Sequence, residues 1–205
     1  MVITLLLMTI LEKNLRKWIN KMKKIFFLFL VISFSFFSIV SAQEREAKLN
    51  ELFNQLKNNS DVSSAFEIEM KIWNIWSTHP SQENLTQLLA KGSNLMSEQK
   101  LNKAYETFSI VIGLDPRWAE GWNKRATVLY MLGRYHESQK DIDEVLKLEK
   151  RHFGALSGQG LVQTELKNYE KAIDSYKEVQ KIYPSMQAPK VMIPQLKELI
   201  KGQSI

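Results

Sequence analysis

An internal repeat of 34 residues constrains the fold of this chain more than any other feature. When the sequence is shifted by 34, small residues coincide at two positions of the period and large apolar residues at four. Three copies fit without a gap, over residues 85–118, 119–152 and 153–186. A fixed period of this length is typical of stacked helical units, each of which buries its apolar face only against its neighbours. The sequence therefore predicts an all-α array of hairpins.

Each recurring residue class has a physical reason. Small side chains let the two helices of a hairpin approach closely, and large apolar ones fill the space on either side of that contact. Proline lacks a backbone donor and ends the second helix of a unit, although Lys150 takes that place in the middle copy. The residues that define the repeat are Gly92, Ala104, Phe108, Pro116, Trp122, Ala126, Tyr135, Ser138, Gly160, Tyr169, Ala172, Tyr176 and Pro184.

The turn inside each hairpin differs between the copies. Gly133 can adopt the left-handed conformation that ends the first helix of the middle unit. Gln99 and Lys167 stand at the equivalent positions of the outer units. Because side chains with a Cβ resist that conformation, the outer turns are expected to be less comfortable.

The repeat resembles the tetratricopeptide repeat family over 102 residues. Arg125 departs from its pattern where an aliphatic residue is usual, and Leu129 and Gln163 depart where an aromatic one is usual. The resemblance implies a right-handed α-solenoid of antiparallel helical hairpins, with three such units and flanking capping helices. It also implies a protein-binding module, but this architecture serves many partners and names none of them.

The flanking segments are expected to complete the stack. Residues 43–84 contain two apolar stripes at helical spacing, separated by a polar turn, and predict a helical hairpin that caps the N-terminal side. Residues 187–205 predict an amphipathic helix that caps the C-terminal side, which Pro194 either begins or kinks. Terminal units of a repeat array need such polar-backed lids for solubility.

Residues 1–42 read as a targeting segment. A basic start at Met22 is followed by an apolar run over 25–40 and by small residues up to Ala42, so a signal peptide over 22–42 is expected, with cleavage before Gln43. The chain would then be exported to the periplasm. The alternative is a membrane anchor over 25–42. Residues 1–21 are interpreted as lying upstream of the true start.

The charge of the chain does not indicate a nucleic-acid partner. The formal net charge is +6, but residues 1–42 contribute +5 of it and the remainder is close to neutral. Duplex binding needs clustered Lys and Arg, and the body of the chain has no such cluster. Absent cysteines remove thiolate chemistry, and the three histidines do not recur with carboxylates at catalytic or metal-binding spacing. We therefore expect no enzyme, no metal, no cofactor and no small-molecule substrate.

The first helices of the repeats line the concave face of such a solenoid, and their inward positions are the candidate binding site. In family members that grip a carboxylate terminus, Lys, Arg and Asn stand at set positions, which here hold Leu89, Ser93, Lys124, Gly154 and Gly158. That clamp is missing, so an extended or helical peptide held by hydrogen bonds and apolar pockets fits better. The candidate groove residues are Leu89, Ser93, Met96, Asn123, Thr127, Tyr130, Ser157, Leu161 and Thr164.

Three further residues carry expectations of their own. Arg125 should form a structural ion pair with Asp141 or Asp143, because an unpaired buried guanidinium is costly. His152 is expected to be structural or on the surface. Trp118, at the turn between repeats, could be half exposed and anchor a partner.

Together these features predict a protein–protein interaction scaffold or adaptor of the cell envelope. A protein or peptide partner would lie in the concave groove, with Tyr130 as the anchor and Asn123 bonding a backbone amide of the ligand. The alternative is a structural or self-associating envelope protein, whose groove is filled by a neighbouring copy or by a terminal helix of the same chain.

Overall fold

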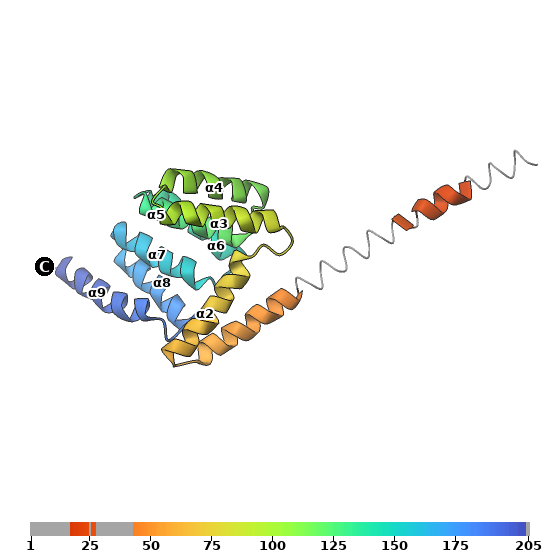
Figure 1. Cartoon of the computed structure of the whole chain (residues 1–205). Coiled ribbons are helices and arrows are strands. Elements are labelled where there is room, and N and C mark those ends of the chain that lie inside the picture. Colours follow the sequence, from red (N-terminus) through yellow and green to blue (C-terminus); the bar gives the residue numbers. More distant parts are fainter. Residues whose placement is uncertain (1–16, 25, 28–42, 204–205) are drawn as a thin grey trace, which may run out of the picture. The chain divides into compact units, whose positions relative to one another are not determined.

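The computed structural model describes residues 17–24, 26–27 and 43–203, and every regular element within these ranges is a helix (Figure 1). The chain divides into two compact units, 1–47 and 48–205. In the first unit, residues 17–24 are helical. No helix in the described part of the chain combines the length and the apolar character needed to cross a bilayer.

The targeting predictions fall mainly on residues that the structure does not describe. The predicted run over 25–40 is described only at 26–27, and Ala42 at the predicted cleavage site lies outside the described residues. Residues 1–16 lie outside them as well. Export and processing therefore stay predictions.

The second unit is a row of antiparallel helices, and the predicted all-α solenoid of helical hairpins is confirmed. The repeats contribute one hairpin each: α3 with α4, α5 with α6, and α7 with α8 (Figure 1). The part from residue 48 onward of a helix over residues 43–58 precedes them, followed by α2, and α9 comes last. The labelled helices are α2 (Val62–Ser77), α3 (Glu83–Ser97), α4 (Leu101–Leu114), α5 (Ala119–Met131), α6 (Tyr135–Leu148), α7 (Phe153–Glu165), α8 (Tyr169–Ile182) and α9 (Gln187–Gln203).

The small residues of the repeat mark close approaches between paired helices. A Cβ added to Gly92 would lie 2.5 Å from the ring of Phe108, and one added to Gly160 would lie 2.5 Å from the ring of Tyr176. In the middle hairpin, the hydroxyl of Ser138 donates to a carbonyl oxygen of the facing helix at 2.8 Å. Larger side chains at these positions would push the helices apart.

The turns within the hairpins share one geometry. Gly133 has a φ of 71°, and Gln99 and Lys167 have φ values of 58° and 59°. In each turn the next N–H bonds the carbonyl five residues earlier at 2.8–2.9 Å, which is the Schellman arrangement that ends a helix. The expected strain of the outer turns is confirmed, because two residues with side chains occupy the left-handed region.

The N-terminal hairpin, formed by the helix over 43–58 and α2, does not cap the first repeat, and that prediction is wrong. Its apolar stripes, which include Phe53 and Ile72, share one hydrophobic cluster with Phe153, Leu156 and Tyr183 of the third repeat. Polar contacts across the same boundary join the hydroxyl of Tyr183 to a carboxylate of α2 at 3.0 Å. The hairpin thus packs on the helices of the last repeat.

The first repeat needs no lid because its outer surface is already polar. Gln87, Lys91 and Asn94 are exposed on α3. One period later, Arg125 and Val128 stand at the positions of Lys91 and Asn94, and they contact the first repeat. The first repeat thus has polar residues at the positions that contact a preceding repeat in the second one. The N-terminal hairpin is not needed there and buries its apolar stripes elsewhere.

At the other end, α9 packs on the second helix of the last repeat. Leu196 is buried against Ala172 and Tyr176 of α8. Pro194 lies inside α9 rather than at its start, so the predicted alternative in which it begins the helix is wrong.

Candidate functional site

The first helices of the three repeats, α3, α5 and α7, carry the nine predicted groove residues, and two of them are not available to a partner. Leu89 is 2% exposed and packs with Phe108 and Val128 in the core of the first hairpin, because α4 and α5 close over it. Asn123 is 7% exposed, and its Nδ2 donates to both carboxylate oxygens of Glu120, at 3.3 and 3.2 Å. The Nδ2 donor of Asn123 is therefore already paired within the protein, and the side chain offers little exposed surface to a ligand.

Three of the groove hydroxyls bond their own helices. Ser93, Thr127 and Thr164 each donate to the carbonyl oxygen one turn earlier, at 3.1, 3.0 and 2.7 Å. The hydroxyl of Ser157 lies 3.8 Å from the sulfur of Met186, in the connection after α8. Met96 is half-buried against the core of the first hairpin and adds little free surface.

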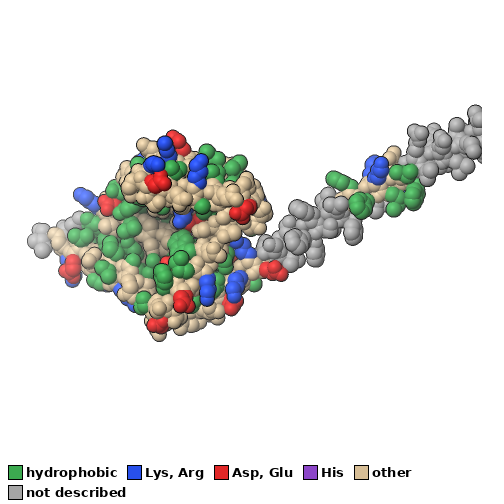
Figure 2. All heavy atoms as spheres, viewed as in Figure 1, with side chains coloured by type: hydrophobic (Ala, Val, Ile, Leu, Met, Phe, Trp, Pro, Cys, Tyr) green, Lys and Arg blue, Asp and Glu red, His purple; other side chains and the backbone are tan. Residues whose placement is uncertain are grey.

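A cleft opens between α5 and α7 and brings four of the nine residues together. Its volume is about 70 Å³. Tyr130 and Leu161 form part of its wall, and the side chain of Leu161 is 39% exposed. Viewed as in Figure 1, the surface is hollowed between the lobe of α3 and α4 and the lobe of α2, α8 and α9, with hydrophobic side chains along the hollow (Figure 2). The cleft is lined by Asn123, Ala126, Thr127, Tyr130, Ser138, Ile142, Gly154, Ala155, Gly158 and Leu161.

Tyr130 keeps a polar end beside this cleft. Its hydroxyl donates to Oε1 of Glu165 at 3.5 Å, and its ring lies 5.5 Å from the ring of Tyr135. Burial and the neighbouring Glu165 carboxylate raise the pKa of Tyr130 above its ordinary value, so the phenol stays protonated at neutral pH. A half-buried aromatic with a hydroxyl donor is the kind of side chain that anchors interfaces.

The N-terminal hairpin covers the other part of the same helices. The ring of Trp73 on α2 lies over Gly154, where an added Cβ would be 2.5 Å from it. The Lys124 ammonium lies 5.5 Å from the centre of that ring. We call the region around Lys124 and Gly154, in the N-terminal halves of α5 and α7, the covered half of the concave face, and Gly154 lies at its border with the cleft. The region of Thr127, Tyr130, Gly158 and Leu161 is the open half.

A buried polar cluster lies under the hairpin. Glu120 is 1% exposed, and its carboxylate meets Nε2 of His152 at 3.2 Å and the Lys124 ammonium at 3.3 Å. Burial alone would raise the pKa of Glu120, but the hydrogen bonds and charges of His152 and Lys124 outweigh it, so its pKa lies below the ordinary value. The carboxylate is therefore ionised and fully partnered, which is a structural role.

His152 and Trp118 join the hairpin to the repeats. Nδ1 of His152 accepts the N–H of Ala155 at 3.0 Å and so caps α7, while its ring stacks on Trp76 with centroids 4.0 Å apart. The structural role expected for His152 is thus what the structure shows. Trp118 is 6% exposed and donates its Nε1 to the Trp76 carbonyl oxygen at 2.9 Å. The expectation that Trp118 is half exposed is wrong, because the hairpin covers it.

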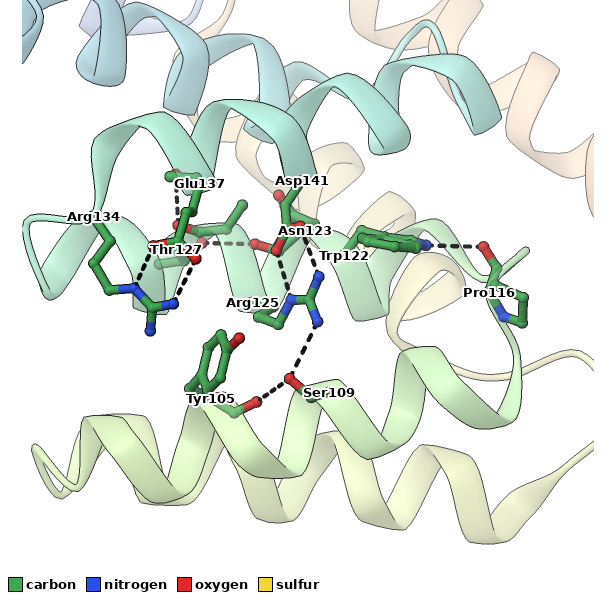
Figure 3. A network of polar contacts seen from close by, with 12 residues as sticks. Tyr105, Ser109, Pro116, Trp122, Asn123, Arg125, Thr127, Arg134, Glu137 and Asp141 are labelled. Atoms are coloured by element: carbon green, nitrogen blue, oxygen red, sulfur yellow. Dashed lines mark hydrogen bonds and ion pairs between the residues drawn. The ribbon is translucent and has the colours of Figure 1, made fainter.

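Arg125 forms the structural ion pair that the sequence predicts, and Asp141 is its partner (Figure 3). Nε and Nη2 bond the two carboxylate oxygens of Asp141 at 2.7 and 2.8 Å, and Nη1 bonds the hydroxyl of Ser109 at 3.2 Å. The hydrogen bonds to Asp141 raise the pKa of Arg125, so the pair stays charged. The two-pronged contact holds α5 against α6 within the second repeat, and the bond to Ser109 joins it to the first repeat, which leaves little of the guanidinium for a partner.

Sequence reasoning missed the covered half altogether. An acidic residue in the first turn of a helix, such as Glu120, is expected to be exposed to solvent and to interact favourably with the helix dipole. One indication in the sequence was the pair of large aromatic side chains on α2. Trp73 and Trp76 lie close together, and burying both rings requires a packing partner besides the neighbouring helix. Their docking site, however, lies 77 residues further along in the pair of Trp76 and Phe153, and it does not follow the 34-residue period.

Comparisons with known proteins agree with this architecture. A family model described as Tetratricopeptide repeat matches residues 155–186. A TPR repeat-containing protein of Rhizobium etli is 33% identical over 156 residues, which are 76% of each chain. Hsp70-Hsp90 organizing protein 1 of Glycine max is 30% identical over 97 residues, 47% of this chain but only 17% of that protein.

Solved structures share the fold at low identity. The Sgt2 TPR domain from Aspergillus fumigatus is similar with a TM-score of 0.57 and 17% identity, over 60% of this chain and 83% of that one. The first TPR of Spaghetti, solved with the HSP90 peptide SRMEEVD, is similar with a TM-score of 0.56 and 18% identity, over 57% of this chain and 93% of that one.

Proposed function

Because the chain belongs to the tetratricopeptide repeat family, we propose that it is an adaptor that holds a segment of a partner protein on the open half of its concave face. The cleft between α5 and α7 carries this proposal. It is the part of the predicted groove where exposed apolar surface, a protonated phenol and small residues meet. Such a combination favours a partner over solvent, since concave apolar sites with few polar groups are typical binding sites.

The lining of the cleft indicates the chemistry of the ligand. Gly158 and Ala155 are small and allow another backbone to come close. A volume of about 70 Å³ accommodates one aliphatic side chain of moderate size. Burying such a side chain contributes roughly 1.5–3 kcal/mol. We therefore propose an extended segment that inserts one aliphatic residue beside Tyr130 and Leu161.

An internal segment fits this site better than a chain terminus. A terminal carboxylate needs unpaired cations, but Lys124 already bonds Glu120 at 3.3 Å. Trp73 also occupies the space over Gly154. The HSP90 peptide bound by the first TPR of Spaghetti is a ligand of that protein, and its mode of binding is not carried over to this chain.

The compartment is a second part of the proposal. The apolar run over 25–40 and the small residues before Gln43 support export to the periplasm, with the adaptor acting in the cell envelope. Intact-mass measurement of the protein purified from cells that express the full chain tests this. The expected mass begins at Gln43, whereas a mass that retains residues 25–42 would place the protein on the membrane.

The binding proposal is tested by capture at two matched positions. A photoreactive side chain at position 130 should cross-link a partner in envelope extract, and one at position 140 on α6 should not, because Lys140 is exposed outside the cleft. With the captured partner in hand, Tyr130→Ala should weaken binding by about 2 kcal/mol, roughly 30-fold, without loss of helicity. If Lys140→Ala weakens binding and Tyr130→Ala does not, the partner binds the other face and the proposal fails.

A further inference from the structure

The outer side of α2 carries an apolar stripe. Val62, Phe66 and Met70 are spaced four residues apart, and their side chains are 50%, 56% and 50% exposed. The opposite side of α2, which includes Ile68 and Ile72, is buried against the helix over 43–58 and the third repeat. An amphipathic helix normally exposes polar residues on its outer side, so a contiguous exposed stripe of this kind marks an interaction surface.

A groove lies beside the stripe. The side chains that project into solvent and the space that could receive them therefore lie on one patch. Its volume is about 720 Å³, and buried Leu52 and partly buried Ile75 form part of its wall. Phe66 and Met70 stand at its edge and project into solvent. Two-fold dimers need such self-complementary patches, because each copy must offer both the side chain that inserts and the space that receives it. The groove is lined by Lys48, Leu52, Phe66, Glu67, Met70, Lys71, Asn74 and Ile75.

The charges along the stripe are self-complementary as well. Glu67 and Lys71 lie one turn apart on the same flank of the stripe, both exposed. Neither forms an ion pair within the described part of the chain. If two α2 helices run antiparallel across a two-fold axis that lies on the side of the stripe, at the height of residues 68–69, the axis places Glu67 of each copy beside Lys71 of the other. Opposite charges meet twice, and like charges are kept apart.

From these observations we infer that a second copy of this chain covers the stripe, with α2 of the two copies packed antiparallel. A membrane surface fits less well, because anionic headgroups attract clusters of Lys and Arg, whereas Glu67 lines the groove together with Lys48 and Lys71. The interface shares no residue with the open half of the concave face, so a dimer would present two binding sites.

Sedimentation velocity of the protein from cells that express the full chain tests the inference. The wild type should pass from monomer to dimer with rising concentration. Phe66→Ser should abolish the dimer, and Lys71→Glu should weaken it about tenfold by replacing two attractions with two repulsions. The double variant Glu67→Lys with Lys71→Glu should recover dimerisation, because the exchanged charges again face their opposites. Lys103→Glu, an exposed lysine on α4, is the matched control and should change nothing.

A second measurement guards against damage to the fold. The chain has no cysteine, so Glu67→Cys introduces a single thiol. Mixed with a Lys71→Cys variant, it should form a disulfide-linked dimer under oxidation, because positions 67 and 71 face each other across the axis, and a mixture with Lys140→Cys should not. A monomer at every concentration up to the solubility limit overturns the inference. So does a dimer that tolerates Phe66→Ser and Lys71→Glu equally, since its interface would then lie elsewhere.

Discussion

The two halves of the concave face are built from the same helices, α5 and α7, but meet different neighbours. In the covered half, Trp73 lies on Gly154, and beneath it Glu120 is enclosed with its polar partners. In the open half, Gly158 has only Ile142 within 4 Å of an added Cβ, at 3.7 Å, and Leu161 reaches solvent. One face is thus filled partly by the chain itself and partly left free.

The difference shows how one surface can serve both stability and binding. In the covered half every polar group of Glu120 and His152 that could attract a ligand is already paired inside the protein. Stability should therefore depend on the covered half, and partner affinity on the open half. Substitutions at matched positions can separate the two, because the helices that carry them are the same.

The largest expected effect comes from the aromatic contact that holds the hairpin. Trp76→Ala removes a ring that is 5% exposed and stacked on His152, and should lower the free energy of unfolding by about 3–5 kcal/mol. Tyr130→Ala in the open half truncates a ring that is only partly buried and should cost far less. Denaturant unfolding of both variants measures this. Equal losses of unfolding free energy in the two variants would show that the covered and open halves of the concave face do not differ in their contribution to stability.

Two glycines sharpen the comparison. Gly154→Ala places a Cβ 2.5 Å from Trp73 and should destabilise the fold by about 1–3 kcal/mol, because the indole must move. Gly158→Ala meets only an ordinary contact at 3.7 Å and should gain up to about 1 kcal/mol from better helix propensity. Thermal and denaturant unfolding measure whether each variant is more or less stable than the wild type. A gain in stability for Gly154→Ala would mean that Trp73 does not lie where the structure places it.

Acid should act on the covered half. The pKa of Glu120 is lowered in the folded state, so its contribution is present above the unfolded pKa and is lost as the pH falls through the folded pKa. The slope from this group is at most about 1.4 kcal/mol per pH unit. Unfolding free energies from neutral to acidic pH should fall less steeply for Glu120→Gln than for the wild type. Parallel curves would show that the carboxylate is not held ionised by His152 and Lys124.

The smallest effect is expected at the turns that follow the first helices. Lys167 adopts a φ of 59°, so Lys167→Gly relieves a left-handed conformation and should stabilise the fold by about 0.5–1 kcal/mol. Gly133→Ala at the equivalent turn should do the opposite, with a loss of about 1 kcal/mol. Differential scanning calorimetry resolves both. Neither substitution should alter the amide hydrogen exchange of α2 or its packing on the covered half.

The sequence predicted what is periodic in this molecule. Gly92 and Gly160 recur opposite large rings because each hairpin repeats the same close approach, and Gly133, Gln99 and Lys167 recur because each turn repeats one backbone geometry. Local geometry of this kind is encoded within one unit of the repeat. It can therefore be read from one chain.

The covered half could not be predicted in this way, because it depends on contacts between distant segments. Trp118 lies at a turn between repeats, where its position along the chain predicts partial exposure. It is buried because it contacts Trp76, which lies 42 residues earlier in the sequence. Leu89 and Asn123 fit the groove by spacing, but their exposure depends on how α4, α5 and the buried Glu120 pack around them. Of the predicted groove, the part around Tyr130 and Leu161 lines the cleft.

Hydrogen exchange of α2 tests most directly whether the hairpin is docked on the concave face. If it is, the amides of residues 65–76 should exchange with protection comparable to that of α5 and α7, because opening α2 would uncover Trp76 and the Glu120–His152 cluster. Gly154→Ala should speed exchange in α2, and Gly158→Ala should not. Rapid exchange of α2 in the wild type, with α5 and α7 still protected, would contradict the account.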